Sequence, residues 1–138
     1  MSEGGWLLDT NVVSELARPQ PNPRVLSFIA TLDRVVVASI VVFELERGIA
    51  LLPSGRRKKH LAGWLETLLS EQIVVADLGV AAARNAARLE ARAQQLGRPI
   101  DTRDALILGT AASASLGVAT RNLAHLAGHG VRTTDPFG

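Results

Sequence analysis

The fold is decided by the stretch Trp6-Leu7-Leu8-Asp9-Thr10-Asn11, a short apolar run that ends in three polar residues. An apolar run that stops at Asp-Thr-Asn predicts a buried strand followed directly by a helix. Open α/β sheets carry their chemistry at the carboxyl ends of their strands, so Asp9 stands where a functional acid is expected. The alternative is structural, because Asp9 is also a good N-cap for the helix that follows.

The composition predicts one globular domain over residues 1–138. Hydrophobic residues make up 47% of the chain and aromatic residues only 4%, so the core must be aliphatic. The chain has no cysteine, which excludes a disulfide framework and a thiolate metal site. The sequence shows no signal-type N-terminus and no apolar run near the ~18 residues of a membrane span. We therefore expect a cytoplasmic protein with no membrane partner.

Predicted strands and helices alternate, which is typical of an α/β sandwich with a mainly parallel sheet. We expect four to five strands, at residues 6–9, 35–38, 73–75, 117–120 and 131–133. Helices are expected between them, at residues 10–17, 23–32, 40–52, 56–69, 79–96 and 102–116. Asn22 and Ser39 stand at N-cap positions. The last of these helices carries no charge after Asp104, as a buried helix should.

Two glutamates compete for a role in the helix at residues 40–52. Its apolar face is formed by Val41, Leu45, Ile49 and Leu52. At about 100° per residue, Glu44 flanks this face on one side and Glu46 on the other, so periodicity does not choose between them. For either glutamate the structural alternative is an exposed ion pair with a basic residue such as Arg47, worth about 0.3–0.5 kcal/mol.

Asp104 begins the buried helix and shares a helical face with Leu108, Ala111 and Ser115. A buried acid is costly unless a cation meets it. The helix N-terminus supplies part of that compensation, and a metal ion would supply much more. The structural alternative is a capping role within the segment that starts at Asp101.

Acids from separate parts of the chain can act together as oxygen ligands. Gathered carboxylates suit Mg²⁺ or Mn²⁺ rather than zinc, and such sites hydrolyse phosphodiester bonds. Asp9, Asp104 and one of the two glutamates are therefore candidate ligands, although the chemistry alone leaves other uses for them open.

Four stretches carry recognisable motifs, at Leu7–Leu16, Ser39–Ile49, Gly97–Ile107, and Thr120–Asn122 with Asp135–Phe137. On these residues the chain resembles the PIN-domain ribonucleases, and within them the VapC-type toxins of bacterial toxin–antitoxin pairs. The resemblance implies a three-layer PIN-like sandwich. It also implies that Asp9, Glu44 and Asp104 are the metal ligands, which assigns Glu44 rather than Glu46.

The activity implied by the resemblance is that of a Mg²⁺- or Mn²⁺-dependent endoribonuclease. Such an enzyme hydrolyses RNA and leaves 5′-phosphate products. The resemblance further implies neutralisation by a cognate VapB-like antitoxin. A homodimer built on helices beside the site, and larger toxin–antitoxin assemblies, are implied as well.

One position departs from the family pattern. His125 stands where an Asp is usual, so the fourth acid is missing, and Asn122 is expected to assist through its amide oxygen. A second metal ion should therefore bind less firmly. A catalytically weakened PIN fold that acts as a binding module is the alternative.

We reject a response-regulator-type phosphoacceptor, because Asp9 has no acidic neighbour and the only lysines are Lys58 and Lys59.

The basic and histidine clusters are explained without a functional role. The run Arg56–His60 and the i,i+4 series Arg84, Arg88 and Arg92 are more typical of solvated helix surfaces than of RNA contacts. His125 and His129 have helical spacing but lack a third ligand, so we expect no zinc site there.

Overall fold

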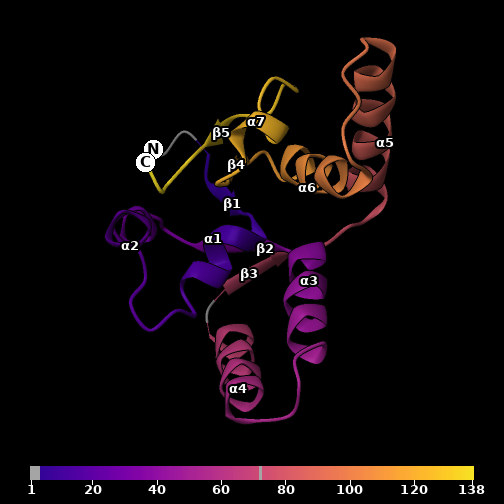
Figure 1. Ribbon diagram of the computed structural model, residues 1–138. Helices are drawn as coiled ribbons and strands as arrows, with labels where there is room; N and C mark the ends of the chain where they lie inside the picture. Colours follow the sequence, from indigo (N-terminus) through magenta and orange to yellow (C-terminus); the bar gives the residue numbers. More distant parts are fainter. Residues whose placement is uncertain (1–3, 72) are drawn as a thin grey trace.

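A five-stranded sheet forms the centre of the computed structural model, which describes residues 4–71 and 73–138 (Figure 1). All neighbouring strands are parallel, in the order β3-β2-β1-β4-β5. The strands are β1 (Trp6–Leu8), β2 (Val35–Ala38), β3 (Ile73–Ala76), β4 (Gly117–Ala119) and β5 (Thr133–Thr134). The predicted α/β fold with a parallel sheet is confirmed.

The central strands form the middle of the core. Leu7 and Leu8 of β1 are completely buried, between β2 on one side and β4 on the other. The β2 sequence Val35-Val36-Val37-Ala38 is buried after its first residue. A β-branched run of this kind is what a strand covered on both faces requires.

Helices cover both faces of the sheet, which gives the predicted three layers. Figure 1 shows α3 and α4 on one side of the strands and α5 and α6 on the other. In agreement, α3 packs on β2, α4 on β3, and α6 against both β2 and β4. The described helices are α1 (Thr10–Glu15), α2 (Pro23–Ala30), α3 (Ser39–Ala50), α4 (Arg56–Ser70), α5 (Val80–Gln95), α6 (Thr102–Ser113) and α7 (Leu123–Leu126).

The capping predictions met different outcomes. Asn22 caps α2 as predicted, because its Oδ1 accepts a hydrogen bond from the Arg24 N–H at 2.8 Å. The prediction that Ser39 caps α3 is wrong, since Ala38 holds the cap position and Ser39 is the first helical residue. The Ser39 hydroxyl instead accepts a hydrogen bond from the Leu78 N–H at 3.1 Å, which ties α3 to the segment after β3.

Helix α6 is mostly buried, as its lack of charge predicted. It ends at Ser113, three residues earlier than expected. Ser115 follows with a φ of 57°, in the left-handed region, so the chain has already turned toward β4. None of the helices within residues 4–71 and 73–138 has the length and hydropathy of a membrane span.

The strand order places the chemistry at one edge of the sheet. From β1 the chain adds β2 and β3 on one side, and β4 and β5 later join on the other. Such a reversal opens a crevice at the carboxyl ends of the strands on either side of it. Asp9 follows β1 and Thr120 follows β4, so both residues lie at this crevice.

Candidate active site

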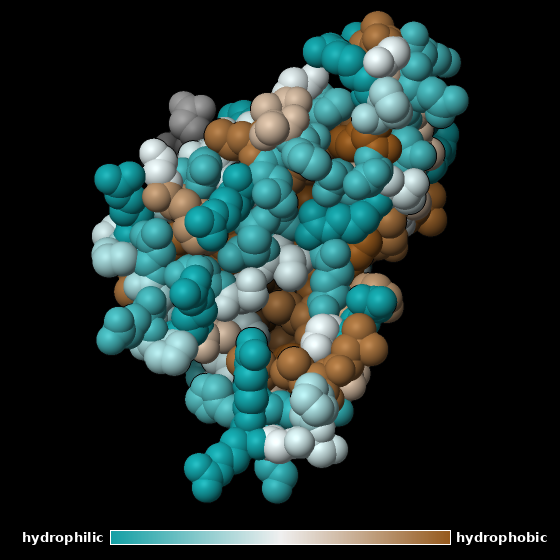
Figure 2. Space-filling model, in the orientation of Figure 1, coloured by the Kyte–Doolittle hydropathy of each residue, from teal (hydrophilic) through white to brown (hydrophobic). Residues whose placement is uncertain are grey.

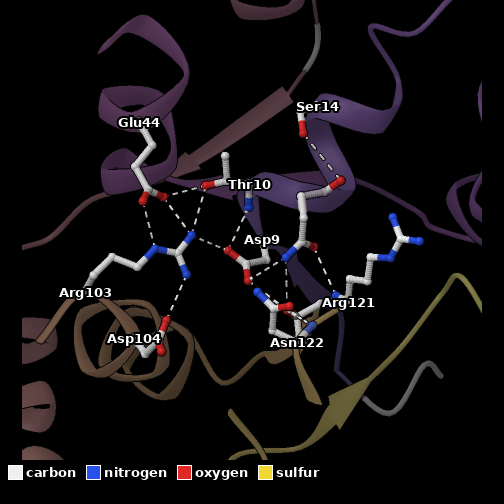
Figure 3. Close-up of polar contacts among 10 residues, drawn as sticks. Asp9, Thr10, Ser14, Glu44, Arg103, Asp104, Arg121 and Asn122 are labelled. Carbon is white, nitrogen blue, oxygen red and sulfur yellow. Dashed lines mark hydrogen bonds and ion pairs between the residues drawn. The ribbon is translucent and has the colours of Figure 1, made fainter. Parts of the chain in front are cut away.

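The predicted acids meet at this crevice around one arginine (Figure 3). Asp9 comes from the end of β1, and Glu44 from the second turn of α3. Arg103 and Asp104 come from the first turn of α6. Segments far apart in the sequence therefore supply a single polar cluster.

Asp9 has no solvent exposure, and four donors satisfy its carboxylate. Its Oδ1 accepts hydrogen bonds from the Thr10 N–H at 2.7 Å and from Arg103 Nη2 at 2.5 Å. Its Oδ2 accepts from the Thr120 hydroxyl at 2.8 Å and from the Asn11 amide at 3.4 Å. Asp9 is also the N-cap of α1, so its capping role and its place in the site coexist.

The Arg103 guanidinium makes five hydrogen bonds within the cluster. Its Nη2 contacts Asp9 Oδ1, Glu44 Oε1 at 2.7 Å and the Thr10 hydroxyl at 3.0 Å. Its Nε donates to Glu44 Oε2 at 2.9 Å, and its Nη1 donates to Asp104 Oδ1 at 3.0 Å. Burial by itself lowers the pKa of Arg103, but the hydrogen bonds with Glu44 and Asp9 outweigh it and raise the pKa.

Glu44, rather than Glu46, belongs to this cluster. The Thr10 hydroxyl donates to Glu44 Oε1 at 2.5 Å, whereas Glu46 is exposed. Partial burial by itself raises the pKa of Glu44. The hydrogen bonds from Arg103 and Thr10 and the charge of Arg103 lower it further than burial raises it, so the net pKa lies below the ordinary value. The basic partner of Glu44 is therefore Arg103, not Arg47.

Asp104 has the cation that its burial demands. Its side chain is only 13% exposed and pairs with Arg103, the residue immediately before it. Its place in the first turn of α6 adds the favourable field of the helix N-terminus. Asp101 occupies the N-cap position, but its side chain makes no capping hydrogen bond. The capping explanation thus fails for this segment.

Several polar neighbours of the acids were not predicted to have roles. Thr10, Asn11 and Thr120 contact the acids directly, and the available signal was their place beside Asp9 or within the Thr-x-Asn motif. Asn122 is exposed, and its backbone N–H donates to the Thr120 hydroxyl at 3.0 Å. The Asn11 amide, not that of Asn122, contacts Asp9.

The ligand chemistry of the cluster fits a divalent cation, but the arginine lies in its middle. Hard carboxylate and hydroxyl oxygens surround one positive charge, which is the donor set that Mg²⁺ and Mn²⁺ accept. In the structure, however, these oxygens bind a guanidinium. Among residues 4–71 and 73–138, no three acidic or histidine side chains lie close enough together to hold one ion.

A mostly apolar groove of about 660 Å³ leads away from the site between α1, α3 and α4. Thr10 and Glu44 form its end at the acids. Figure 2 shows apolar atoms at the bottom of a hollow in the same region. Its apolar lining includes Leu45, Ile49, Leu52, Leu61 and Trp64.

A basic cavity lies on another side of the site. It has a volume of about 440 Å³ and is lined by residues that include Arg88, Arg92, Arg98 and His129. A neighbouring cavity of about 420 Å³ shares Arg98 and His129 with it and extends to His125 and Asp104. In the part of the chain that the structure describes, none of the three arginines forms an ion pair.

The sequence from residue 6 to residue 126 matches the model of the PIN domain. The chain belongs to the PIN-domain family. The toxin FitB of Neisseria gonorrhoeae is 41% identical over 122 residues, which cover 84% of this chain and 86% of FitB. The VapC ribonuclease Y4jK of Sinorhizobium fredii is 32% identical over 137 residues, which cover 95% of this chain and 96% of Y4jK.

Solved structures of toxin–antitoxin complexes agree with this chain in fold. A structure of FitAB bound to an IR36 DNA fragment superposes with a TM-score of 0.84. The sequence identity is 33%, over 96% of this chain and 95% of that chain. A DNA-bound VapBC complex from Salmonella typhimurium gives a TM-score of 0.83 at 25% identity, over 96% of this chain and 98% of that chain. The predicted PIN-like sandwich is thus confirmed.

Proposed function

We propose that this PIN-domain chain is a toxin that cuts RNA as a metal-dependent endoribonuclease. The observation that carries the proposal is the convergence of Asp9, Glu44 and Asp104 on one cationic group at the reversal point of the sheet. The relationship to a protein named VapC ribonuclease supports the reaction class.

The donor set favours Mg²⁺ or Mn²⁺ as the cofactor, held by Asp9, Glu44 and Asp104. Their oxygens are hard ligands, and the chain offers no cysteine that would favour a softer metal. A bound divalent ion supplies such a site with an activated water and with stabilisation of the leaving oxygen of a phosphodiester.

The polar neighbours prepare the acids for this role. Thr120 and Asn11 fix the Asp9 carboxylate in one orientation, and the Thr10 hydroxyl does the same for Glu44. Such fixed oxygens need little reorganisation when a charged ligand arrives. We assign Asn122, which is exposed at the same edge, an assisting role toward water or RNA.

Two neighbouring cavities that share Arg98 and His129 offer RNA a place beside Asp104. Phosphates need unpaired cations; Arg88, Arg92 and Arg98 line the first cavity, and the second includes both Arg98 and Asp104. Arginine binds phosphate oxygens through two parallel N–H groups. We therefore place the RNA backbone in these cavities, although for Arg88 and Arg92 the sequence alone favoured simple solvation.

The remaining surfaces suit protein partners. We expect a segment of a VapB-like antitoxin to bind in the apolar groove beside Glu44 and to silence the toxin. The toxin would act in the cytoplasm.

The predicted homodimer has support in exposed apolar side chains near the start of α3 and α5. Phe43 is 62% exposed, Val80 is 76% exposed, and Leu78 is 39% exposed.

A second candidate function, that of a binding module with weakened catalysis, rests on specific residues. His125 replaces the usual fourth acid, and Arg103 lies among the three acids that are present. Both features reduce the negative charge available to hold an ion.

One assay separates the two functions. The purified chain, free of any partner, is incubated with structured RNA in the presence of Mg²⁺, Mn²⁺ or EDTA, beside an Asp9→Asn variant. We expect cleavage with either metal and none with EDTA. The Asp9→Asn variant should cleave at least about 100-fold more slowly, because one of the three proposed metal ligands is removed.

An Asp33→Asn variant is the matched control, since Asp33 is exposed at the opposite edge of the sheet, before β2. It should cleave RNA like the unaltered chain. Equal cleavage by the Asp9→Asn variant, or none by any form, would exclude the nuclease proposal and favour the binding module.

A further inference from the structure

Arg103 holds the position in which a metal ion would meet the acids. One nitrogen, Nη2, contacts carboxylate oxygens of both Asp9 and Glu44, at 2.5 and 2.7 Å. The neighbouring Nη1 contacts Asp104 at 3.0 Å. A single side chain thus bridges all three acids, which come from three different elements.

We propose that Arg103 is the internal counter-cation of this site. It pairs with Asp9, Glu44 and Asp104 when no divalent ion is bound, and it must leave them before an ion can bind all three. The inference rests on the proposed function in one respect, since it takes these three acids as the ion ligands.

The chemistry of the guanidinium makes this an exchange of cations. An arginine does not lose its proton in proteins, so raising the pH does not release it. While the three acids stay ionised, another cation must take over their carboxylates before Arg103 leaves. Three carboxylates against one guanidinium also leave two negative charges unbalanced, and these attract a divalent ion to the cluster.

The position of Arg103 allows such an exchange. Its side chain is 29% exposed, so it has an open route to solvent. It also lies in the first turn of α6, so rotation about its own side-chain bonds moves the guanidinium without a change in the helix. Asp104, the next residue, keeps its place on the buried face of α6.

A competing internal cation lowers the affinity of the site for metal. The acids remain satisfied and folded without an ion, and the ion must displace five hydrogen bonds to enter. At low metal concentration Arg103 therefore keeps the three acids paired and the ion unbound.

The test measures Mn²⁺ binding by calorimetry, without RNA, on the full chain and on an Arg103→Ala variant. We expect the variant to bind Mn²⁺ at least about tenfold more tightly, because an opposing charge in contact with the ligands is removed. Arg121→Ala is the matched control. This substitution removes a cation from the same end of the sheet, where the Arg121 guanidinium stacks on the Phe137 ring. It should change the Mn²⁺ affinity less than about threefold.

A second readout follows the exchange itself. Titration of the unaltered chain with Mg²⁺ should shift the NMR signal of the Arg103 Nε–H away from its hydrogen-bonded position. If the alanine variant fails to fold, Arg103→Lys serves instead, and its affinity should rise in the same direction by a smaller factor. Unchanged or weaker Mn²⁺ binding in the variant would overturn the proposal. Because no RNA is present, a chain that proves inactive on RNA would disprove the nuclease function and leave this result interpretable.

Discussion

The buried carboxylate of Asp9 needs compensation from its neighbours. A carboxylate without solvent exposure costs several kcal/mol unless hydrogen bonds and a counter-charge compensate it. Thr10, Thr120 and Asn11 provide the hydrogen bonds, and Arg103 provides the charge. This compensation lets the chain keep a negative group at the crevice before any ion binds.

His125 is the residue whose replacement should strengthen the site. It lines the same cavity as Asp104 but brings no negative charge at neutral pH. The carboxylate that a His125→Asp substitution introduces should tighten Mn²⁺ binding roughly fivefold, since one more nearby charge contributes about 1 kcal/mol even at the dielectric of water. His129→Asp is the control, because His129 lines that cavity outside the Thr-x-Asn motif. Calorimetry that finds no gain for His125→Asp would make the missing fourth acid irrelevant.

The packing of helix α5 against helix α6 fixes the position of the site. Gly109 of α6 lies so close to α5 that an added Cβ would stand 2.6 Å from the Ala82 carbonyl oxygen and 2.6 Å from the Ala86 nitrogen. Both atoms belong to the backbone and cannot move aside. The two helices must therefore separate if any larger residue replaces this glycine, and α6 carries Arg103 and Asp104.

A Gly109→Ala variant should lower the free energy of unfolding by about 1–3 kcal/mol, the usual cost of overpacking. Gly63→Ala in α4 is the matched control. Within residues 4–71 and 73–138, an added Cβ there has no neighbour within 4 Å, so the better helix propensity of alanine should raise stability by about 0.5–1 kcal/mol. Urea denaturation measures both variants. A Gly109→Ala protein as stable as the unaltered chain would contradict the close packing.

The elements were largely predictable because their signals are local. The β-branched run of β2 is a signal carried by four adjacent residues, and the Asn22 cap bonds a residue two positions away. Both predictions are confirmed. Ser39 was assigned wrongly because its partner is the Leu78 N–H, 39 residues away in the sequence. Long-range partners of this kind leave no trace in periodicity.

The sequence predicted which acids come together in the cluster, but it did not predict the arginine among them. Asp9 and Asp104 stand at the ends of elements, where sequence patterns indicate function. Glu44 needed the family motif, because periodicity treated it and Glu46 alike. Arg103 lies 94 residues from Asp9 and 59 from Glu44, so only the folded chain brings its charge to them.

The basic side chains are unevenly distributed, although the formal net charge is only +2. Arg88, Arg92 and Arg98 line one cavity, and Arg98 also lines the neighbouring cavity that includes Asp104. This distribution should appear as salt-dependent binding of RNA.

An Asp9→Asn chain allows RNA binding to be measured without cleavage. A further alanine substitution at Arg88, Arg92 or Arg98 should weaken binding and reduce the slope of log K against log salt by about 0.7 for each phosphate that no longer meets an arginine. Arg34→Ala, at the opposite edge of the sheet, should leave the slope unchanged. Fluorescence anisotropy at several salt concentrations supplies the data. Equal slopes for all variants would remove these cavities from the RNA path.

We propose that Asp9, Glu44 and Asp104 together hold a divalent ion in the place that the Arg103 guanidinium occupies. Anomalous diffraction from crystals of the chain grown in millimolar Mn²⁺ would locate such an ion. We predict a manganese peak bound by oxygens of the three carboxylates, with the Arg103 guanidinium turned away from them. Arg103 still bonded to all three acids, with no manganese among them, would show that these acids do not hold the ion.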